Sequence, residues 1–548
     1  MIDFEKIRQA AAEAIASAEI TAISIAVVEK DRMTFAEGFG TTRLEHGTPV
    51  TASTLFDYAS IAKVFCGILT MRLVENGLLD LDRPIIDYLD NFAFHNTDYG
   101  KRVTLRHLLS HTSGLPMGAR SMGPTTLDGL ARSVREEIPH YRFSAEPGRL
   151  TNYANTAFCI AGHVAEVVTG HSYPTLVYEQ IFDPLGMHSC NYDLSNVIMQ
   201  PVALPYHWNS HGERVLNKRL PNNLAGLPSG FYYGTAVDLA KMAVMLLNGG
   251  LLSATSIDEM MRAHGTTHFE SATHYIQQQE LSYGLGLKMG EYRGHRLVRH
   301  GGSIPGYQNF FQLFPDQERA VVILTTAVGE NALLDLVSAV QDAVLELPPL
   351  TSHRMPPPAP APLPITLDLP KLVGRYLNPR QATMPTVSLE GETLMLETFG
   401  RKFPLTYTAS GEFTAPLTEQ VVIPVRFLLG DAGRAEHVII FTTPYQRNDE
   451  SPPETVDLSR YEGCYQDRFN REPSEVLEVR VVDGVLHLGD IATELAPARP
   501  LGKHRFLTQI GLAEFEFSAE NELIALQIAH AARYRPLKSQ PRQRSHYK

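Results

Sequence analysis

A proline-rich stretch near residue 350 constrains how this chain can fold. Residues 348–349 are both proline, and residues 356–364 read PPPAPAPLP. Proline has no backbone N–H and a fixed φ, so such a run cannot continue a helix or join an inner strand. We interpret residues 351–366 as a semi-rigid polyproline linker between domains. The alternative is a long surface loop inside one domain, which the change of pattern after the linker disfavours.

Bulk properties place the chain among soluble multidomain proteins. A chain of 548 residues is too long for one hydrophobic core, which predicts about two to four domains. Its 44% hydrophobic and 20% charged residues are ordinary for globular proteins. The net charge of -12 argues against nucleic acid or an anionic membrane as the main partner. No apolar run reaches the ~18 residues of a membrane span.

The remaining bulk signals concern compartment and cofactors. The first 20 residues form a charged amphipathic pattern without the apolar segment of a signal peptide. The four cysteines have no C-x-x-C spacing, which favours buried thiols in a reducing compartment. No HExxH or paired Cys/His cluster indicates a metal, and no cofactor is expected. We expect a cytoplasmic protein with a small-molecule or peptide substrate, no nucleic acid and no membrane; a homodimer is left open.

Before the linker, residues 1–350 alternate between helical and β-rich patterns. The run 20–39 contains two β-rich segments around a polar turn, which predicts a hairpin. Helical patterns are expected at the N-terminus and in the segments 60–74, 103–109, 155–169, 236–247 and 333–347. Successive antiparallel strands are expected over 294–302, 307–314 and 320–326. The prediction is an α+β domain in which helices pack on an antiparallel sheet.

After the linker, the sequence repeats weakly. The matched positions lie 89 or 93 residues apart: Leu369, Gly374 and Tyr376 with Leu458, Gly463 and Tyr465, and Gly391 and Phe413 with Gly484 and Phe506. Short strands every 8–12 residues predict two small antiparallel β-barrels, at 367–450 and 451–537. The basic tail 538–548 is expected to be disordered.

The tetrapeptide Ser60-Ile61-Ala62-Lys63 opens an apolar helix and is a candidate nucleophile motif. Positions i and i+3 share a helix face, so Ser60 and Lys63 can approach each other. Burial and the helix dipole would lower the pKa of Lys63, which prepares it to accept a proton. S-x-x-K is the nucleophile motif of β-lactamases and penicillin-binding proteins. The alternative is that Ser60 caps the helix and Lys63 is a solvated charge.

A lysine base needs a hydroxyl partner, and three Tyr-x-Asn triplets offer one. They begin at Tyr153, Tyr307 and Tyr376, and spacing alone does not choose among them. Tyr376 belongs to the barrel repeat, and Tyr307 begins a predicted strand. Tyr153 lies on a loop before a helix, where a side chain can point into a cleft. We therefore select Tyr153.

A third element is the segment His300-Gly301-Gly302-Ser303. Its glycines allow a substrate or backbone to approach closely at the end of a strand. Alternation places His300 and Gly302 on one face of the strand, and Arg299 and Gly301 on the other. The alternative is that His300 is a histidine with satisfied hydrogen bonds at a strand edge.

The order Ser60-x-x-Lys63, Tyr153-x-Asn155, His300-x-Gly302 resembles the serine β-lactamase and penicillin-binding-protein-like hydrolases, in the class C β-lactamase-like and D-aminopeptidase branch. Four further stretches carry the same resemblance: TLRHLLSHTSGLP at 104–116, FDPLGM at 182–187, SYGLGL at 282–287 and HGGSIPGY at 300–307. The appended pair of barrels resembles the lipocalin-like barrels of D-aminopeptidases.

The resemblance implies a β-lactamase/transpeptidase-like catalytic domain, in which a helical subdomain packs on the sheet and the site lies between them. It implies that Ser60 is acylated while Lys63 and Tyr153 shuttle the proton. Asn155 would hydrogen-bond the substrate and Lys63. The backbone N–H groups of Ser60 and Ser303 would form the oxyanion hole.

One departure from the family pattern bears on specificity. Where β-lactamases and carboxypeptidases of this superfamily carry Lys-Thr-Gly, this chain has His300-Gly301-Gly302. A mostly neutral histidine binds a substrate carboxylate more weakly than lysine does. We therefore favour an amidase or aminopeptidase acting on D-amino-acid amides or peptides. The alternatives are an esterase or an acyl- or peptidyl-transferase, including a peptide cyclase, and a non-catalytic binding protein.

Overall fold

The computed structural model describes residues 2–118, 123–208, 213–218, 220–265, 278–327, 331–349, 367–378, 384–408, 412–416, 422–430, 432–440, 443–450, 457–467, 476–490, 495–502, 504–508, 511–518, 523–528 and 532–536. The predicted linker and basic tail lie outside these ranges. Contacts divide the chain into two compact units. The first comprises Met1–Ala93, Thr97–Arg135 and Ala145–Pro357, and the second comprises Phe94–Asn96, Glu136–Ser144 and Pro358–Lys548.

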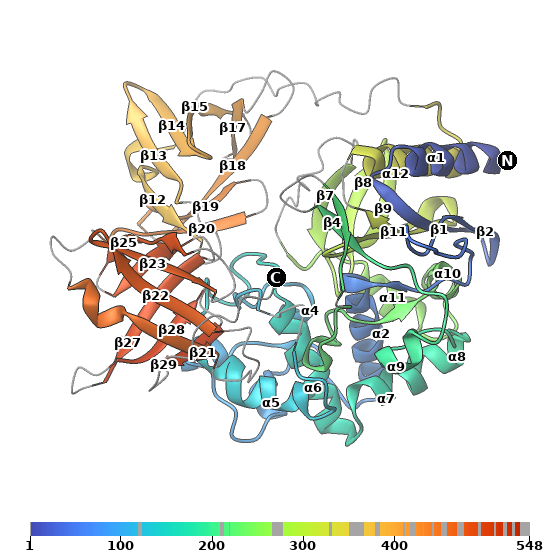
Figure 1. The fold of residues 1–548 in the computed structure, drawn as a ribbon, viewed down its shortest axis with the longest axis horizontal. Helices are drawn as coiled ribbons and strands as arrows, with labels where there is room; N and C mark the ends of the chain where they lie inside the picture. Colours follow the sequence, from blue (N-terminus) through green and yellow to red (C-terminus); the bar gives the residue numbers. More distant parts are fainter. Residues whose placement is uncertain are drawn as a thin grey trace. The chain divides into compact units, whose positions relative to one another are not determined.

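An antiparallel sheet of seven described strands forms the centre of the first unit (Figure 1). In spatial order the strands are β2 (Arg32–Gly40), β1 (Ile20–Glu29), β11 (Arg319–Ala327), β10 (Tyr307–Phe314), β9 (His295–Ile304), β8 (Lys288–Tyr292) and β7 (Gln278–Tyr283). The hairpin β1–β2 and the succession β9–β10–β11 confirm the strands predicted from the β-rich runs.

One face of this sheet is covered by the two end helices of the unit. Helices α1 (Phe4–Ala16) and α12 (Asn331–Val344) lie side by side there (Figure 1). They pack with Ile23 and Ile25 of β1 and Ile323 of β11 in one apolar core. Because strand side chains alternate between faces, the neighbouring residues of these strands point to the opposite face.

The opposite face carries α10 (Ala236–Asn248), which packs on β1 and β11. Helix α2 (Ala62–Glu75) is buried on nearly every side, which explains why residues 60–74 have no polar face. It packs against α6 (Asn155–Thr169). Nearby lie two shorter helices, α4 (Leu105–Leu109) and α11 (Ala254–Met260). Thr104 caps α4, since its Oγ1 accepts from the His107 N–H at 3.3 Å.

The second unit contains two antiparallel sheets, each of nine described strands. The first has the order β15 (Arg401–Pro404), β14 (Thr393–Thr398), β13 (Thr386–Glu390), β12 (Gly374–Leu377), β20 (Thr443–Arg447), β19 (Ala435–Ile440), β18 (Val422–Leu429), β17 (Glu412–Pro416) and β16 (Thr406–Tyr407). The second has the order β24 (Ala496–Pro497), β23 (Val485–Asp490), β22 (Val476–Val482), β21 (Gly463–Asp467), β29 (Ala532–Pro536), β28 (Leu523–Ile528), β27 (Gly511–Phe517), β26 (Arg505–Thr508) and β25 (Arg499–Gly502).

The two sheets share one strand order, as the sequence repeat predicted. In each, the two edge strands are consecutive in the chain, so the sheet curls into a nearly closed barrel around its own apolar core. The repeated tyrosines make the same contact: Tyr376 donates to Leu372 O at 2.6 Å, and Tyr465 donates to Tyr461 O at 2.5 Å. The likeness to lipocalins remains a prediction. Within the described ranges, no helix is both long and apolar enough to cross a bilayer.

Candidate active site

The candidate nucleophile lies in a tight turn between a short strand and α2. Strand β3 (Phe56–Asp57) pairs with β6 (Tyr233–Gly234), and a single 3-10 turn, η1 (Ala59–Ile61), follows. Ser60 is the middle residue of this turn and is partly exposed. Its side chain caps neither η1 nor α2. The interpretation of Ser60 as a helix cap is therefore wrong.

Lys63 is the buried partner of Ser60. Its side chain is 0% exposed, so the interpretation as a solvated charge is also wrong. Lys63 Nζ lies 3.1 Å from Ser60 Oγ and donates to the backbone carbonyl of Ser229 at 2.8 Å. The pKa of Lys63 is lowered to about 7, mainly by burial and to a smaller extent by the charge of Lys288. Near neutral pH the amine is therefore partly unprotonated and able to accept a proton.

Tyr153 completes the group around the Ser60 hydroxyl. Its phenol forms a side-chain hydrogen bond with Ser60. The ring centroid of Tyr153 lies 4.8 Å from Lys63 Nζ, so the serine, the amine and the phenol meet at one point. Burial raises the pKa of Tyr153 above its ordinary value, and the bond with Ser60 opposes the shift. The tyrosine therefore stays protonated at neutral pH and can act as a proton donor.

Asn155 differs from what the resemblance implied. It is the first residue of α6, next to the others, but its Oδ1 atom is buried without a hydrogen-bond partner among the described residues. Lys63 Nζ instead bonds Ser60 and Ser229. The Asn155–Lys63 hydrogen bond that the resemblance implied is therefore not formed in this structure.

His300 is 1% exposed, and both of its ring nitrogens are occupied. Nδ1 lies 2.6 Å from the Gly301 carbonyl oxygen, which can only accept, so Nδ1 carries the proton. Nε2 therefore accepts from the Tyr283 hydroxyl at 2.8 Å. Burial lowers the pKa of His300 well below its ordinary value, and the charges of Lys63 and Lys288 lower it further. His300 is held neutral, more firmly than its reference pKa alone implied.

Gly302 permits a close contact between β9 and the nucleophile turn. A Cβ atom on Gly302 would lie 2.1 Å from the carbonyl oxygen of Tyr58, so no larger residue fits. This is the close backbone approach that the glycines predicted. Arg299 lies by alternation on the other face of β9, with Leu297 of the core under α1 and α12. Ser303 is exposed, and its part in an oxyanion hole stays a prediction.

Two aromatic residues of the site had no assigned role in the sequence analysis. His111 lies between Tyr153 and Tyr283, with ring centroids 4.2 Å and 4.5 Å away. Its Nδ1 accepts from the Ala154 N–H at 3.0 Å and so fixes the backbone beside Tyr153. Tyr283 holds the tautomer of His300. Both lie in stretches quoted for the family resemblance, HTSG and SYGLGL, which was the available signal.

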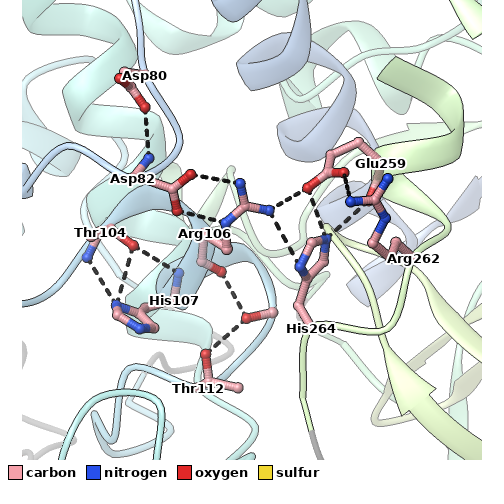
Figure 2. A network of polar contacts seen from close by, with 10 residues as sticks. Asp80, Asp82, Thr104, Arg106, His107, Thr112, Glu259, Arg262 and His264 are labelled. Atoms are coloured by element: carbon pink, nitrogen blue, oxygen red, sulfur yellow. Dashed lines mark hydrogen bonds and ion pairs between the residues drawn. The ribbon is translucent and has the colours of Figure 1, made fainter. Parts of the chain in front are cut away.

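A charged network supports the segments that carry these residues (Figure 2). Arg106 of α4 donates to both carboxylate oxygens of Asp82, at 2.6 Å and 2.7 Å, and also to Glu259 of α11. His264 lies 3.3 Å from the same guanidinium, and its backbone N–H donates to Tyr283 O at 3.0 Å. Arg106 therefore ties the helix that leads to His111 to the segment that holds Tyr283.

The described residues contain no group of three or more His, Cys, Asp or Glu side chains suited to a metal ion. The groups that this site brings together suit proton transfer at a hydroxyl: a serine, an amine of lowered pKa and a protonated phenol in mutual contact. Such a group can activate a nucleophile and return the proton to a leaving group.

Known proteins resemble this chain in sequence and in fold. A profile of the Beta-lactamase family matches residues 7–344. The chain is 27% identical over 357 residues to penicillin-binding protein 4 of Amycolatopsis lactamdurans, covering 60% of this chain and 86% of that protein.

Two solved structures share the fold. The octameric penicillin-binding protein homologue from Pyrococcus abyssi has a TM-score of 0.55 at 23% identity, covering 81% of this chain and 99% of that chain. The D-amino acid amidase from Ochrobactrum anthropi SV3 has a TM-score of 0.52 at 21% identity, covering 62% and 98%. Because the family profile spans more than half of its residues, this chain belongs to the Beta-lactamase family.

Proposed function

We propose that this protein is a serine hydrolase that forms an acyl-enzyme on Ser60 and acts as an amidase or aminopeptidase on D-amino-acid amides or peptides. One observation carries the proposal: a buried lysine amine, its pKa lowered to about 7, lies 3.1 Å from a partly exposed serine hydroxyl that also bonds Tyr153. A non-catalytic binding protein would have no need to keep all three groups in contact.

The geometry supports a definite proton path. The unprotonated Lys63 amine takes the Ser60 proton as Oγ attacks the substrate carbonyl carbon, giving a tetrahedral intermediate. The leaving amine then receives a proton from the Tyr153 phenol. The protonated Lys63 amine can pass the proton that it took from Ser60 on to Tyr153. Water attacks the ester in the second half-reaction, and the same groups work in reverse order. The predicted donors to the oxyanion are the backbone N–H groups of Ser60 and Ser303.

The preference for substrates without a free carboxylate rests on His300. Both ring nitrogens are used within the protein, by Gly301 O and the Tyr283 hydroxyl. The ring therefore has neither a positive charge nor a free donor for a carboxylate next to the scissile bond. Amides and peptides that are neutral at this position fit best. The preference for D-amino acids rests on the family resemblance.

The test compares substrates that differ in their leaving group and in their D or L configuration, all with the same protein. We would measure the turnover of D- and L-amino-acid p-nitroanilides, short p-nitrophenyl esters and a cephalosporin, with Ser60→Ala and the exposed control Ser195→Ala alongside. We expect D-amides to be cleaved faster than the cephalosporin, no turnover by Ser60→Ala, and an acyl adduct on Ser60 by intact mass.

Two outcomes would contradict the proposal in different ways. Activity retained in Ser60→Ala would refute the acyl-enzyme. Turnover of esters without D-amides, or acyl transfer to an added amine in place of hydrolysis, would keep the acyl-enzyme and identify the protein as an esterase or a transferase.

A further inference from the structure

A buried carboxylate that the proposed proton path does not use lies beside the nucleophile turn. Asp57 is the last residue of β3 and is 0% exposed. Its Oδ1 accepts a hydrogen bond from the Ala59 N–H at 2.8 Å, across two residues of chain. Ala59 is the residue directly before Ser60. Burying a carboxyl group costs free energy, so the contact of Asp57 with this turn requires an explanation.

The Ala59 backbone adopts a conformation that alanine disfavours. Its φ is +48°, in the left-handed region where Cβ crowds the backbone. Such a conformation persists only where the surroundings fix it. The side chain of Asp57 supplies this support in the manner of an Asx turn, by holding the Ala59 N–H.

The rest of the turn is anchored by the sheet. Asn309 Nδ2 donates to the carbonyl oxygen of Asp57 at 2.7 Å. The Tyr58 N–H donates to Tyr232 O at 2.7 Å, and Gly302 lies against the Tyr58 carbonyl. These contacts fix Asp57 and Tyr58. The hydrogen bond from Ala59 to Asp57 ties the residue before the nucleophile to this anchored segment.

We propose that Asp57 is a positioning residue for Ser60: by accepting the Ala59 N–H, it holds the left-handed turn that places Ser60 Oγ against Lys63 and orients the Ser60 N–H toward the reacting carbonyl. This inference rests on the proposed acylation of Ser60. Asp57 acts through Ala59 and touches neither Lys63 nor the substrate.

Asp57 acts as an acceptor and not through its charge. The titratable groups that face it are the phenols of Tyr233 on β6 and Tyr307 on β10, which are neutral in the physiological range. Burial raises the pKa of Asp57 to about 7. The pKa of Lys63 is lowered by burial and by the charge of Lys288, against the opposing effect of the nearby thiols. Removing the charge while keeping an acceptor oxygen should therefore preserve function.

The experiment compares Asp57→Ala and Asp57→Asn in the full chain, with the best substrate of the amide and ester panel. The matched control is Asp193→Ala, because Asp193 makes the same contact to Ser195 N at 2.9 Å at the exposed start of a short helix. Ser60→Ala reports on the underlying chemistry, and thermal unfolding reports on folding.

We expect Asp57→Ala to lower kcat by about 100-fold with little change in KM, since a displaced nucleophile loses rate more than binding. Asp57→Asn should stay within about tenfold of wild type and keep the same acid limb of its pH profile, because that limb belongs to Lys63. Asp193→Ala should keep the kcat of wild type.

Three results would overturn the inference. They are an Asp57→Ala variant as active as wild type, an Asp57→Asn variant as impaired as Asp57→Ala, and an acid limb that disappears in Asp57→Asn. If Asp57→Ala is unfolded, Asp57→Asn decides alone through its rate and pH profile. Activity in Ser60→Ala would instead refute the proposed acyl-enzyme, so the two failures are distinguishable.

Discussion

The loop around Tyr153 and the first barrel strand around Tyr376 contain the same Tyr-x-Asn triplet, and they differ in what meets the phenol hydroxyl. Tyr376 donates to Leu372 O at 2.6 Å and accepts from Arg447 Nη2 at 3.0 Å. Tyr153 bonds the Ser60 side chain and lies against the Lys63 amine. Burial raises the pKa of both tyrosines, that of Tyr376 to about 12.

The comparison separates burial from reactivity. Desolvation keeps both phenols neutral, but only Tyr153 lies beside groups that can exchange a proton with it. The hydroxyl of Tyr376 is fixed by a main-chain carbonyl, which cannot exchange a proton with it. The hydroxyl of Tyr153 faces two groups that can. A shifted pKa marks a buried tyrosine, and its neighbours decide whether it serves structure or chemistry.

The largest effect on activity is expected when the amine beside Ser60 and Tyr153 is removed. Lys63→Met should lower kcat by about 10³- to 10⁴-fold, because Ser60 loses its base while a side chain of similar length fills the space. The measurement is steady-state kinetics on the preferred amide. The control Lys241→Met removes a half-exposed lysine paired with Asp238 and should keep the kcat. Near-normal activity in Lys63→Met would mean that another group activates Ser60.

The pH dependence of kcat/KM tests the role of Lys63 as the base in a second way. The amine must be unprotonated to act, and its pKa is lowered to about 7. We therefore expect kcat/KM to rise about tenfold per pH unit below pH 7 and to level off above it. The raised pKa of Tyr153 predicts no alkaline loss until well above this plateau. A profile that is flat between pH 5 and 7 would contradict the role of Lys63.

A pair of neighbouring glycines tests the close packing of β9 on the nucleophile turn. Gly302→Ala should lose about 1–3 kcal/mol of stability and much of the activity, since its Cβ would lie 2.1 Å from Tyr58 O. Gly301→Ala should be tolerated, because its nearest contact would be 3.5 Å away. Thermal unfolding and kcat, measured on both variants, would show the contrast. Equal effects would mean that the turn can shift.

The smallest effect on activity is expected in the barrels. Tyr376→Phe should cost about 1–2 kcal/mol in the stability of the second unit, because Leu372 O loses its donor. Tyr465→Phe should behave alike, since Tyr461 O loses the same contact. Neither should change kcat, whereas Tyr153→Phe should lower it by about 100-fold. A fall in kcat for Tyr376→Phe would remove the distinction drawn above.

The sequence by itself determined the order of the reactive groups and most of the architecture. Ser60 and Lys63 are three residues apart, so one helical turn brings them together wherever the helix packs. The long periodic segments became α6, α10 and β9 to β11 nearly as expected. The duplication of the barrel was visible in the sequence because the same Gly and Tyr positions recur once in each barrel.

Only the tertiary structure decided what surrounds these groups. The carbonyl of Ser229 that holds Lys63 has no sequence signal, because every residue has such a carbonyl. The hydrogen bond that the resemblance implied between Asn155 and Lys63 is not formed. Tyr283 fixes the tautomer of His300 from another strand of the sheet. Asp57 holds the backbone of Ala59 across the turn. Local pattern fixes which residues can share a helix face, whereas pKa and tautomer depend on atoms brought close by packing.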